Sequence, residues 1–196
     1  TVEVGPELPR RFTVQVPDKD PEFSDLAAAE AYALGLLNAD RARHGVAALV
    51  LDPALAAVAR AHSEDMRDNH FFGHRSVRTG LAADRLEVAR YRSIAHGENL
   101  ARNDALAEAE ESLLGSVGHR RSLLDPHFTH VGIGLARAER AAVADGATAD
   151  WYLTQLFTRP VRPVDPETVI ALVHDRIAAA RAAAGAPILS EDAALA

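Results

Sequence analysis

The absence of cysteine is the feature of this 196-residue chain that most constrains its fold. Without thiols there is no disulfide bridge, no thiolate nucleophile and no thiolate metal ligand. A buried core must therefore stabilise the fold, and the length suits one ordinary domain with further segments at its ends. Alanine supplies much of the 48% apolar content and aromatic residues only 5%. This composition predicts a core of Leu, Val, Ala and a few Phe.

The charge of the chain excludes several classes of partner. The formal net charge is −7, and no basic cluster lacks nearby acids, so we expect neither nucleic acid nor an anionic membrane surface as a partner. No segment approaches the ~18 uncharged apolar residues of a membrane span. The opening residues, TVEVGPELPRRF, lack the pattern of a signal peptide, so we expect a chain that is cytosolic, already processed or trimmed.

Local patterns divide the chain into three parts. Residues 1–25 are rich in Pro and Gly and predict an N-terminal arm or linker, with a short strand over Arg11–Val16. The main domain is expected over residues 26–160. Its first helix is predicted to be capped by Ser24 and to end at Gly45.

Helical and β patterns alternate within the main domain. Asp52 is the predicted cap of a second helix, on which His62 faces the apolar side as a hydrogen-bonded core residue. Asp104 is predicted to cap a further helix. Alternating apolar residues predict two strands, over 131–136 and 151–157.

Residues 161–196 are expected to form a proline-rich linker and a helix over 167–184. This segment matches an earlier part of the chain at an offset of 140 residues. Two alanine-rich helices that each end at a glycine can align by chance. Five matches other than alanine in one register favour an internal repeat, in which residues 161–196 begin a second, similar domain. The matched pairs are Arg41 and Arg181, Gly45 and Gly185, Leu49 and Leu189, Asp52 and Asp192, and Leu55 and Leu195.

Several short segments carry the side chains that could form a site. Each is unspecific alone. In chain order they are A-H-S-E-D-M at 61–66, F-F-G-H at 71–74, H-G-E-N-L at 96–100, S-V-G-H-R at 116–120, F-T-H-V-G-I-G at 128–134 and Y-L-T-Q-L-F at 152–157.

In this order, the motifs resemble bacterial members of the CAP superfamily, which carry the SCP-like extracellular domain. Asn38, Arg41 and Gly45 match the N-x-x-R-x-x-x-G pattern at the end of the family's first helix. The resemblance covers about residues 28–158. It implies an α+β fold, a three-layer α-β-α sandwich with a small, mostly antiparallel sheet between helices. It also implies a secreted, extracellular protein.

The same resemblance implies a cleft with two His and two Glu. By motif, the histidines are His74 and His119, and the first glutamate is Glu98. The second glutamate of the family has no clear counterpart, because Ser116 stands at the aligned position and two glutamates at 110–111 precede it on the helix.

Two neutral imidazoles and a carboxylate are suitable ligands for Zn²⁺ or another divalent cation with an open position for water. With such a metal, Glu98 would act as a general base. Without one, it could fix a histidine tautomer or accept from a substrate hydroxyl. Asn99 and Ser116 would add hydrogen bonds to a ligand, and His96 would line the site. Alternatively, the same side chains form a satisfied polar network that closes the sheet against the helices.

The sequence lacks the motifs of several other enzyme classes, namely G-x-S-x-G, G-x-x-x-x-G-K-[ST], G-x-G-x-x-G and H-E-x-x-H. Three functions therefore stay open. The first is a secreted binding domain whose cleft holds a divalent cation or a small ligand, with a lipid or cell-wall component on nearby apolar surface. The second is a metal-dependent hydrolase that uses the same residues. The third is a structural or adhesion module of a longer extracellular protein.

Overall fold

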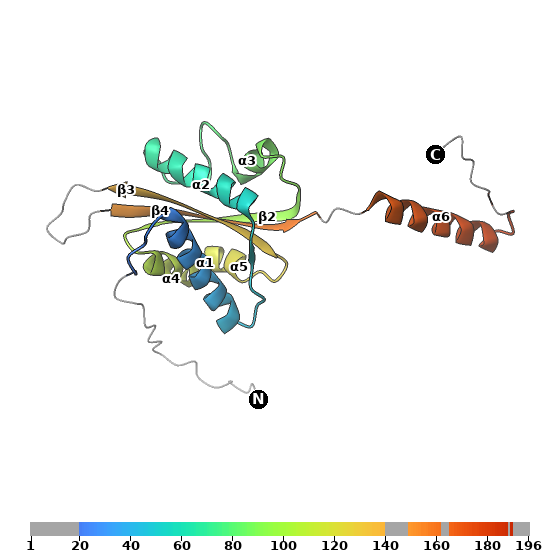
Figure 1. The fold of residues 1–196 in the computed structure, drawn as a ribbon, viewed down its shortest axis with the longest axis horizontal. Helices are drawn as coiled ribbons and strands as arrows, with labels where there is room; N and C mark the ends of the chain where they lie inside the picture. The colour runs from blue at the N-terminus through green and yellow to red at the C-terminus, as the bar shows by residue number, and fades with distance from the viewer. Residues whose placement is uncertain (1–19, 140–148, 162–164, 188, 190–196) are drawn as a thin grey trace, which may run out of the picture. The chain divides into compact units, whose positions relative to one another are not determined.

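The structure, a computed structural model, describes residues 20–139, 149–161, 165–187 and 189. The predicted strand at 11–16 and the matched positions Asp192 and Leu195 lie outside these ranges. The elements in chain order are α1 (Leu26–Arg43), β1 (Val50–Leu51), α2 (Pro53–Asp68), α3 (Ala82–Val88), β2 (Ser93–Asn103), α4 (Leu106–Gly115), α5 (Val117–Leu123), β3 (His130–Glu139), β4 (Ala149–Pro160) and α6 (Pro166–Ala183) (Figure 1).

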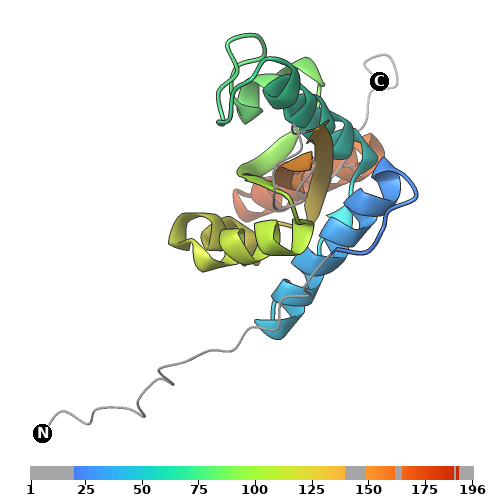
Figure 2. The same ribbon diagram turned by 90° about the vertical axis from the view of Figure 1, so that its left-hand side faces the viewer.

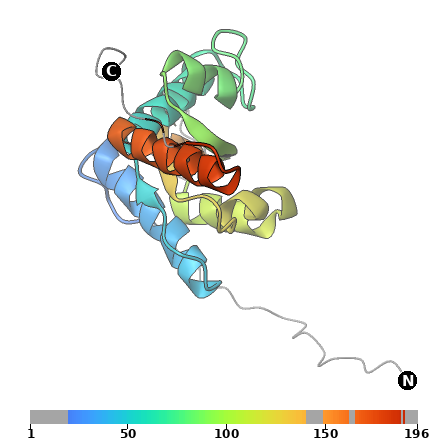
Figure 3. The same ribbon diagram turned by 90° about the vertical axis from the view of Figure 1, so that its right-hand side faces the viewer.

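A four-stranded sheet forms the middle layer of the main domain, in the order β1-β3-β4-β2. β1 is parallel to β3, whereas β4 is antiparallel to both β3 and β2. Helices α2 and α3 cover one face, and α1, α4 and α5 cover the other (Figures 1, 2 and 3). The predicted α+β class, with a three-layer sandwich around a mostly antiparallel sheet, is confirmed.

α1 begins and ends where nearby groups satisfy its backbone. Asp25, and not Ser24 as predicted, caps its N-terminus by accepting a hydrogen bond from the Ala28 N–H at 2.8 Å. The Ser24 hydroxyl instead contacts the Asp25 carboxylate. Both residue types cap well, so the sequence did not distinguish them. At the other end Gly45 has a φ of 71°, as expected for the glycine that follows a helix.

The N-x-x-R-x-x-x-G pattern has a structural role. Arg41 is fully buried, and it donates to the backbone carbonyls of Ala47 at 2.7 Å and Leu123 at 2.6 Å. Asn38 donates to the Leu49 carbonyl at 3.1 Å and accepts from the Leu49 N–H at 2.8 Å. These two side chains therefore tie α1 to the loop before β1 and to the end of α5.

The last residues of the predicted N-terminal arm take part in the main domain. The carboxylate of Asp20 caps α4, because it accepts from the backbone N–H groups of Leu106 at 2.5 Å and Ala107 at 3.1 Å. Asp104, the predicted cap, does not have this role, and the N-cap residue Ala105 provides no side-chain hydrogen bond. The cap comes from a distant part of the sequence, which local patterns do not reveal.

α2 packs directly on β3 because two glycines leave room for its backbone. A Cβ at Gly134 would lie 2.0 Å from the backbone nitrogen of Arg60, and one at Gly132 would lie 2.3 Å from another α2 backbone atom. At the same place the Ser63 hydroxyl donates to the Gly134 carbonyl at 2.9 Å and contacts the Thr154 hydroxyl at 2.8 Å. The V-G-I-G segment therefore positions α2 on the sheet.

The described residues form two compact units, one that ends at Pro160 and one that begins at Val161. The second unit contains α6, which Asp165 caps and which has no buried residue. Among the residues that the structure describes, no helix combines the length and the apolar character needed to cross a bilayer.

We predict that Gly134→Ala lowers the free energy of unfolding by about 1–3 kcal/mol, because the new methyl group must displace the α2 backbone. Denaturant unfolding followed by circular dichroism measures this loss. Gly35→Ala is the matched control, since a Cβ at this exposed α1 position meets no atom within 4 Å. The control should raise the free energy of unfolding by about 0.5–1 kcal/mol. Similar losses in both variants would contradict the packing role of Gly134.

Candidate functional site

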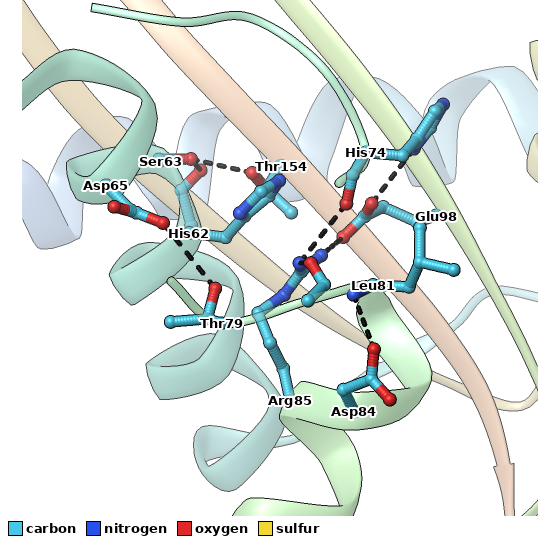
Figure 4. A network of polar contacts seen from close by, with 12 residues as sticks. His62, Ser63, Asp65, His74, Thr79, Leu81, Asp84, Arg85, Glu98 and Thr154 are labelled. Atoms are coloured by element: carbon cyan, nitrogen blue, oxygen red, sulfur yellow. Dashed lines mark hydrogen bonds and ion pairs between the residues drawn. The ribbon is translucent and has the colours of Figure 1, made fainter. Parts of the chain in front are cut away.

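Glu98 lies at the centre of a polar network between the sheet and α3. It belongs to β2, an edge strand of the described sheet, and only 5% of its side chain is exposed. One carboxylate oxygen, Oε1, contacts Nδ1 of His74 at 2.9 Å. The other, Oε2, accepts a hydrogen bond from Nη2 of Arg85 (Figure 4). Both oxygens of the predicted general base are therefore engaged within the protein.

Arg85 organises this network, although the sequence patterns did not identify it. It lies on the short helix α3, and its side chain is only 6% exposed. Besides pairing with Glu98, its Nη1 donates to the carbonyls of Gly80 at 2.8 Å and His74 at 3.2 Å. The guanidinium thus holds both the carboxylate and the backbone of the loop that carries His74. A charged residue on a short helix gives no local indication of its partner. The partner here, Glu98, lies on a strand 13 residues later.

His74 is the exposed member of the network, with half of its side chain open to solvent. The Glu98 carboxylate is an acceptor only, so the contact at 2.9 Å assigns the ring proton to Nδ1 of His74. The lone pair of a neutral imidazole is then on Nε2, which Figure 4 shows on the far side of the ring from Glu98. A carboxylate behind one ring nitrogen fixes both the tautomer and the orientation of the other.

The structure confirms the predicted role of His62 as a hydrogen-bonded core residue. It is 1% exposed, and its Nε2 contacts the Gly73 carbonyl at 3.2 Å. Burial, and then the positive charge of Arg85, lower the pKa of His62. The imidazole is therefore neutral under ordinary conditions and supports the start of the loop that carries His74.

His119 reaches the same region from the other layer of the fold. It lies on α5, and its backbone carbonyl accepts a hydrogen bond from Nδ2 of Asn99 at 3.1 Å. Burial and then the charge of His74 lower the pKa of His119. The two predicted histidines are therefore close enough for their charges to interact, with His74 on one side of β2 and α5 on the other.

The other predicted site residues have different positions. Asn99 is 1% exposed and donates to the backbone carbonyl of His119, and its role toward a ligand stays a prediction. His96 is exposed on β2, two residues before Glu98. Ser116 lies at the junction of α4 and α5, and its side chain does not cap α5. The roles of His96 and Ser116 toward a ligand stay predictions.

A second buried network lies on the opposite face of the sheet. Nε2 of Gln155 donates to Oε2 of Glu110 at 2.5 Å, and Oε1 of Gln155 accepts from Asn99 at 3.4 Å. Burial, and next the nearby Asp40 carboxylate, raise the pKa of Glu110 to about 8. Glu110, one of the two glutamates near the family's second acidic position, is therefore protonated at neutral pH. Its connection to the site runs through Gln155, Asn99 and the His119 carbonyl.

The predicted metal site has two histidine ligands at most. Within the described ranges, no group of three or more His, Cys, Asp or Glu side chains is arranged to hold a metal ion. The Glu98 carboxylate is only 5% exposed and hydrogen-bonds to Arg85 and His74. Any cation here would depend on the two imidazoles and on water.

The comparisons with known proteins agree with this fold and these motifs. The profile of the CAP family, described as the cysteine-rich secretory protein family, matches residues 34–157. The chain belongs to the CAP family. It has no cysteine, so cysteine is not required for the CAP fold in this member.

Two curated relatives come from Bacillus subtilis, and neither has a characterised function. The membrane protein YlbC is 43% identical over 111 residues, which cover 56% of this chain and 32% of YlbC. YkwD is 35% identical over 112 residues, which cover 57% of this chain and 44% of YkwD. The chain thus matches less than half the length of either relative.

Solved structures show the same architecture. An extracellular protein with an SCP domain from Bacillus anthracis is 32% identical, with a TM-score of 0.57, over 72% of this chain and 45% of that one. An outer surface protein from Borrelia burgdorferi has a TM-score of 0.58 at 18% identity, over 70% of this chain and 96% of that one. The second likeness concerns the fold alone.

We predict that Arg85→Met lowers the free energy of unfolding by about 3–5 kcal/mol, because it leaves the buried Glu98 carboxylate without its cation. Thermal and denaturant unfolding measure the loss. Arg78→Met is the matched control. Its side chain is 68% exposed and lies 4.0 Å from Asp65, so the loss there should stay below about 1 kcal/mol. A loss of the same size in both variants would argue against the ion pair as the centre of the network.

We predict that the protonated Glu110 makes stability fall as pH rises. Its folded-state pKa of about 8 exceeds the ordinary value of 4.5, so in this window the folded chain keeps a proton that the unfolded chain has lost. The free energy of unfolding should therefore decrease between about pH 4.5 and 8, by up to about 1.4 kcal/mol per pH unit.

Unfolding midpoints measured across this pH range should show a flatter profile for Glu110→Gln, which is neutral at every pH. Glu111→Gln, at the half-buried neighbouring position, should keep the wild-type slope. An unchanged slope in Glu110→Gln would contradict the assignment.

Proposed function

We propose that this CAP domain is an extracellular ligand-binding module, in which His74 and His119 bind the polar group of a small amphiphilic ligand. The observation that carries the proposal is the fixed orientation of His74. Arg85 and Glu98 are buried and engaged with each other, and they present the half-exposed imidazole with Nε2 outward. A preorganised group of this kind loses little conformational freedom when it binds.

Exposed apolar side chains accompany His74 and favour a ligand with an apolar part. Phe72 is 50% exposed and Val77 fully exposed in the loop that carries His74. Exposed apolar groups next to convergent polar ones are typical of binding surfaces.

The network favours binding over catalysis. A general base needs an oxygen that can reach the proton of a substrate or water molecule. The Glu98 side chain is only 5% exposed, and its two oxygens contact Arg85 and His74. We therefore infer that Glu98 orients His74, and its action as a catalytic base stays a prediction that no geometry here favours.

A divalent cation such as Zn²⁺ is the second candidate for the same two imidazoles. The carboxylate behind Nδ1 of His74 is the kind of support that metal-binding histidines usually have. With two protein ligands, water or an organic ligand would have to complete the coordination. Such a cation would polarise the group bound to it.

The extracellular location is also part of the proposal. Its support is the Bacillus anthracis protein, which is described as extracellular and is 32% identical to this chain. The chain spans less than half of its curated relatives. The proposal therefore concerns this domain and not the activity of a longer protein that contains it.

The proposal is tested by NMR of the histidine side chains, with decanoate and decyl maltoside below their micelle concentrations as probes. Either amphiphile should shift the His74 and His119 imidazole signals of the wild-type chain. The shifts and the heat of binding should disappear in His74→Ala/His119→Ala. They should persist in His127→Ala, the control at a histidine whose side chain is 73% exposed.

Zinc chloride is titrated in parallel by calorimetry. Zinc binding that needs both histidines, with no response to either amphiphile, would replace the proposal with the cation site. If none of the three probes causes an NMR shift or a heat of binding, the binding function is overturned and the network has a structural role only.

A further inference from the structure

α6 repeats α1 at an offset of 140 residues. α1 spans Leu26–Arg43 and α6 spans Pro166–Ala183, so both ends of the two helices coincide in this register. Both helices have an aspartate N-cap, Asp25 and Asp165. Each carboxylate accepts from the backbone N–H three residues further on, at 2.8 and 3.2 Å respectively.

The turns after the two helices are also the same. Gly45 and Gly185 have φ values of 71° and 65°. Nε of Arg41 donates to the carbonyl six residues further on at 2.7 Å, and Nε of Arg181 makes the same bond at the same distance. A chance alignment of two alanine-rich helices explains shared helix content, but it does not explain a shared side-chain contact to the following turn.

The apolar residues of α6 occupy the positions that α1 buries. Val169, Val173 and Ile177 are 41–47% exposed. Their counterparts on α1 are exposed by 2% or less and belong to the main core. Ile170, Leu172 and Leu189 follow the same rule, and each counterpart is buried or packed on that core. The pairs are Val169 and Ala29, Ile170 and Glu30, Leu172 and Tyr32, Val173 and Ala33, Ile177 and Leu37, and Leu189 and Leu49.

We propose that α6 is the first helix of a second CAP-type domain, and that its face of Val169, Val173 and Ile177 covers the sheet of that domain. An isolated helix of 18 residues is marginal in water and gains most of its stability from packing of an apolar face. The residue pairing shows which surface this face fits, because its counterpart on α1 packs against a CAP sheet.

Within the first domain, the equivalent surface of the sheet is already occupied. α1 already covers it with Ala29 and Ala33, which are 0% and 2% exposed. The larger Val169 and Val173 would overpack the same place. One polar contact of α1 would be missing in the second domain. Glu30, which pairs with Arg60 on α2, corresponds to Ile170.

Hydrogen exchange and light scattering on the intact chain give the first test. Without a second sheet, the chain should be a monomer in which the α6 amides exchange at least 100-fold faster than those of α1. A dimer that protects α6 and dissociates in Val173→Glu/Ile177→Glu would overturn the proposal, since a second copy of the chain would then cover this face.

A designed fusion gives the positive test. Residues 1–187 are followed directly by residues 48–160, which continues the offset of 140 and gives α6 a CAP sheet to cover. The α6 amides should become at least 100-fold better protected than in the intact chain. Because that sheet normally meets Ala29 and Ala33, the fusion is also made with Val169→Ala/Val173→Ala to relieve overpacking.

Substitutions on the two faces of α6 provide matched controls in the fusion. Val173→Glu/Ile177→Glu should abolish the protection. Ala171→Glu/Ala179→Glu should keep it, because the α1 counterparts of these two positions are exposed. The proposal is overturned if neither packing form protects α6, or if the two pairs of substitutions act alike.

Discussion

The close contact between α2 and β3 is the constraint on which the site depends. Gly132 and Gly134 allow the α2 backbone to lie where a methyl group would clash, and Ser63 bonds to the strand at the same point. This contact fixes the position of His62 at the buried side of α2. The loop that carries His74 starts from α2 and is supported by His62, so the location of the exposed imidazole follows from a backbone packing distance.

The edge strand β2 connects the two layers on either side of the sheet. Because side chains alternate along a strand, the neighbours Glu98 and Asn99 point to opposite faces. Glu98 fixes His74 together with Arg85, and Asn99 fixes the backbone of His119. The G-E-N motif is therefore a two-sided support that brings a loop and a helix from different layers together. Neither of its polar side chains needs to contact a ligand for the motif to matter.

Local sequence patterns correctly predicted the features that depend on neighbouring residues, such as helix caps. Asp52 caps α2 and Gly45 follows α1 as expected, because both roles depend on a few adjacent residues. The motif order predicted the fold, and of the predicted site residues His74 and Glu98 are in direct contact. Partners far apart in sequence were missed. The Asp20 cap on α4 and the Arg85 ion pair join segments whose proximity only the folded chain creates.

Charge in and around the site is largely cancelled within the protein. Arg85 neutralises Glu98, Glu110 is protonated at neutral pH, and His62 and His119 have lowered pKa values. The region does offer two imidazoles, and the carboxylate of Glu98 fixes the orientation of one of them, His74, next to exposed apolar side chains. These properties support the proposed recognition of a polar group on a mainly apolar molecule.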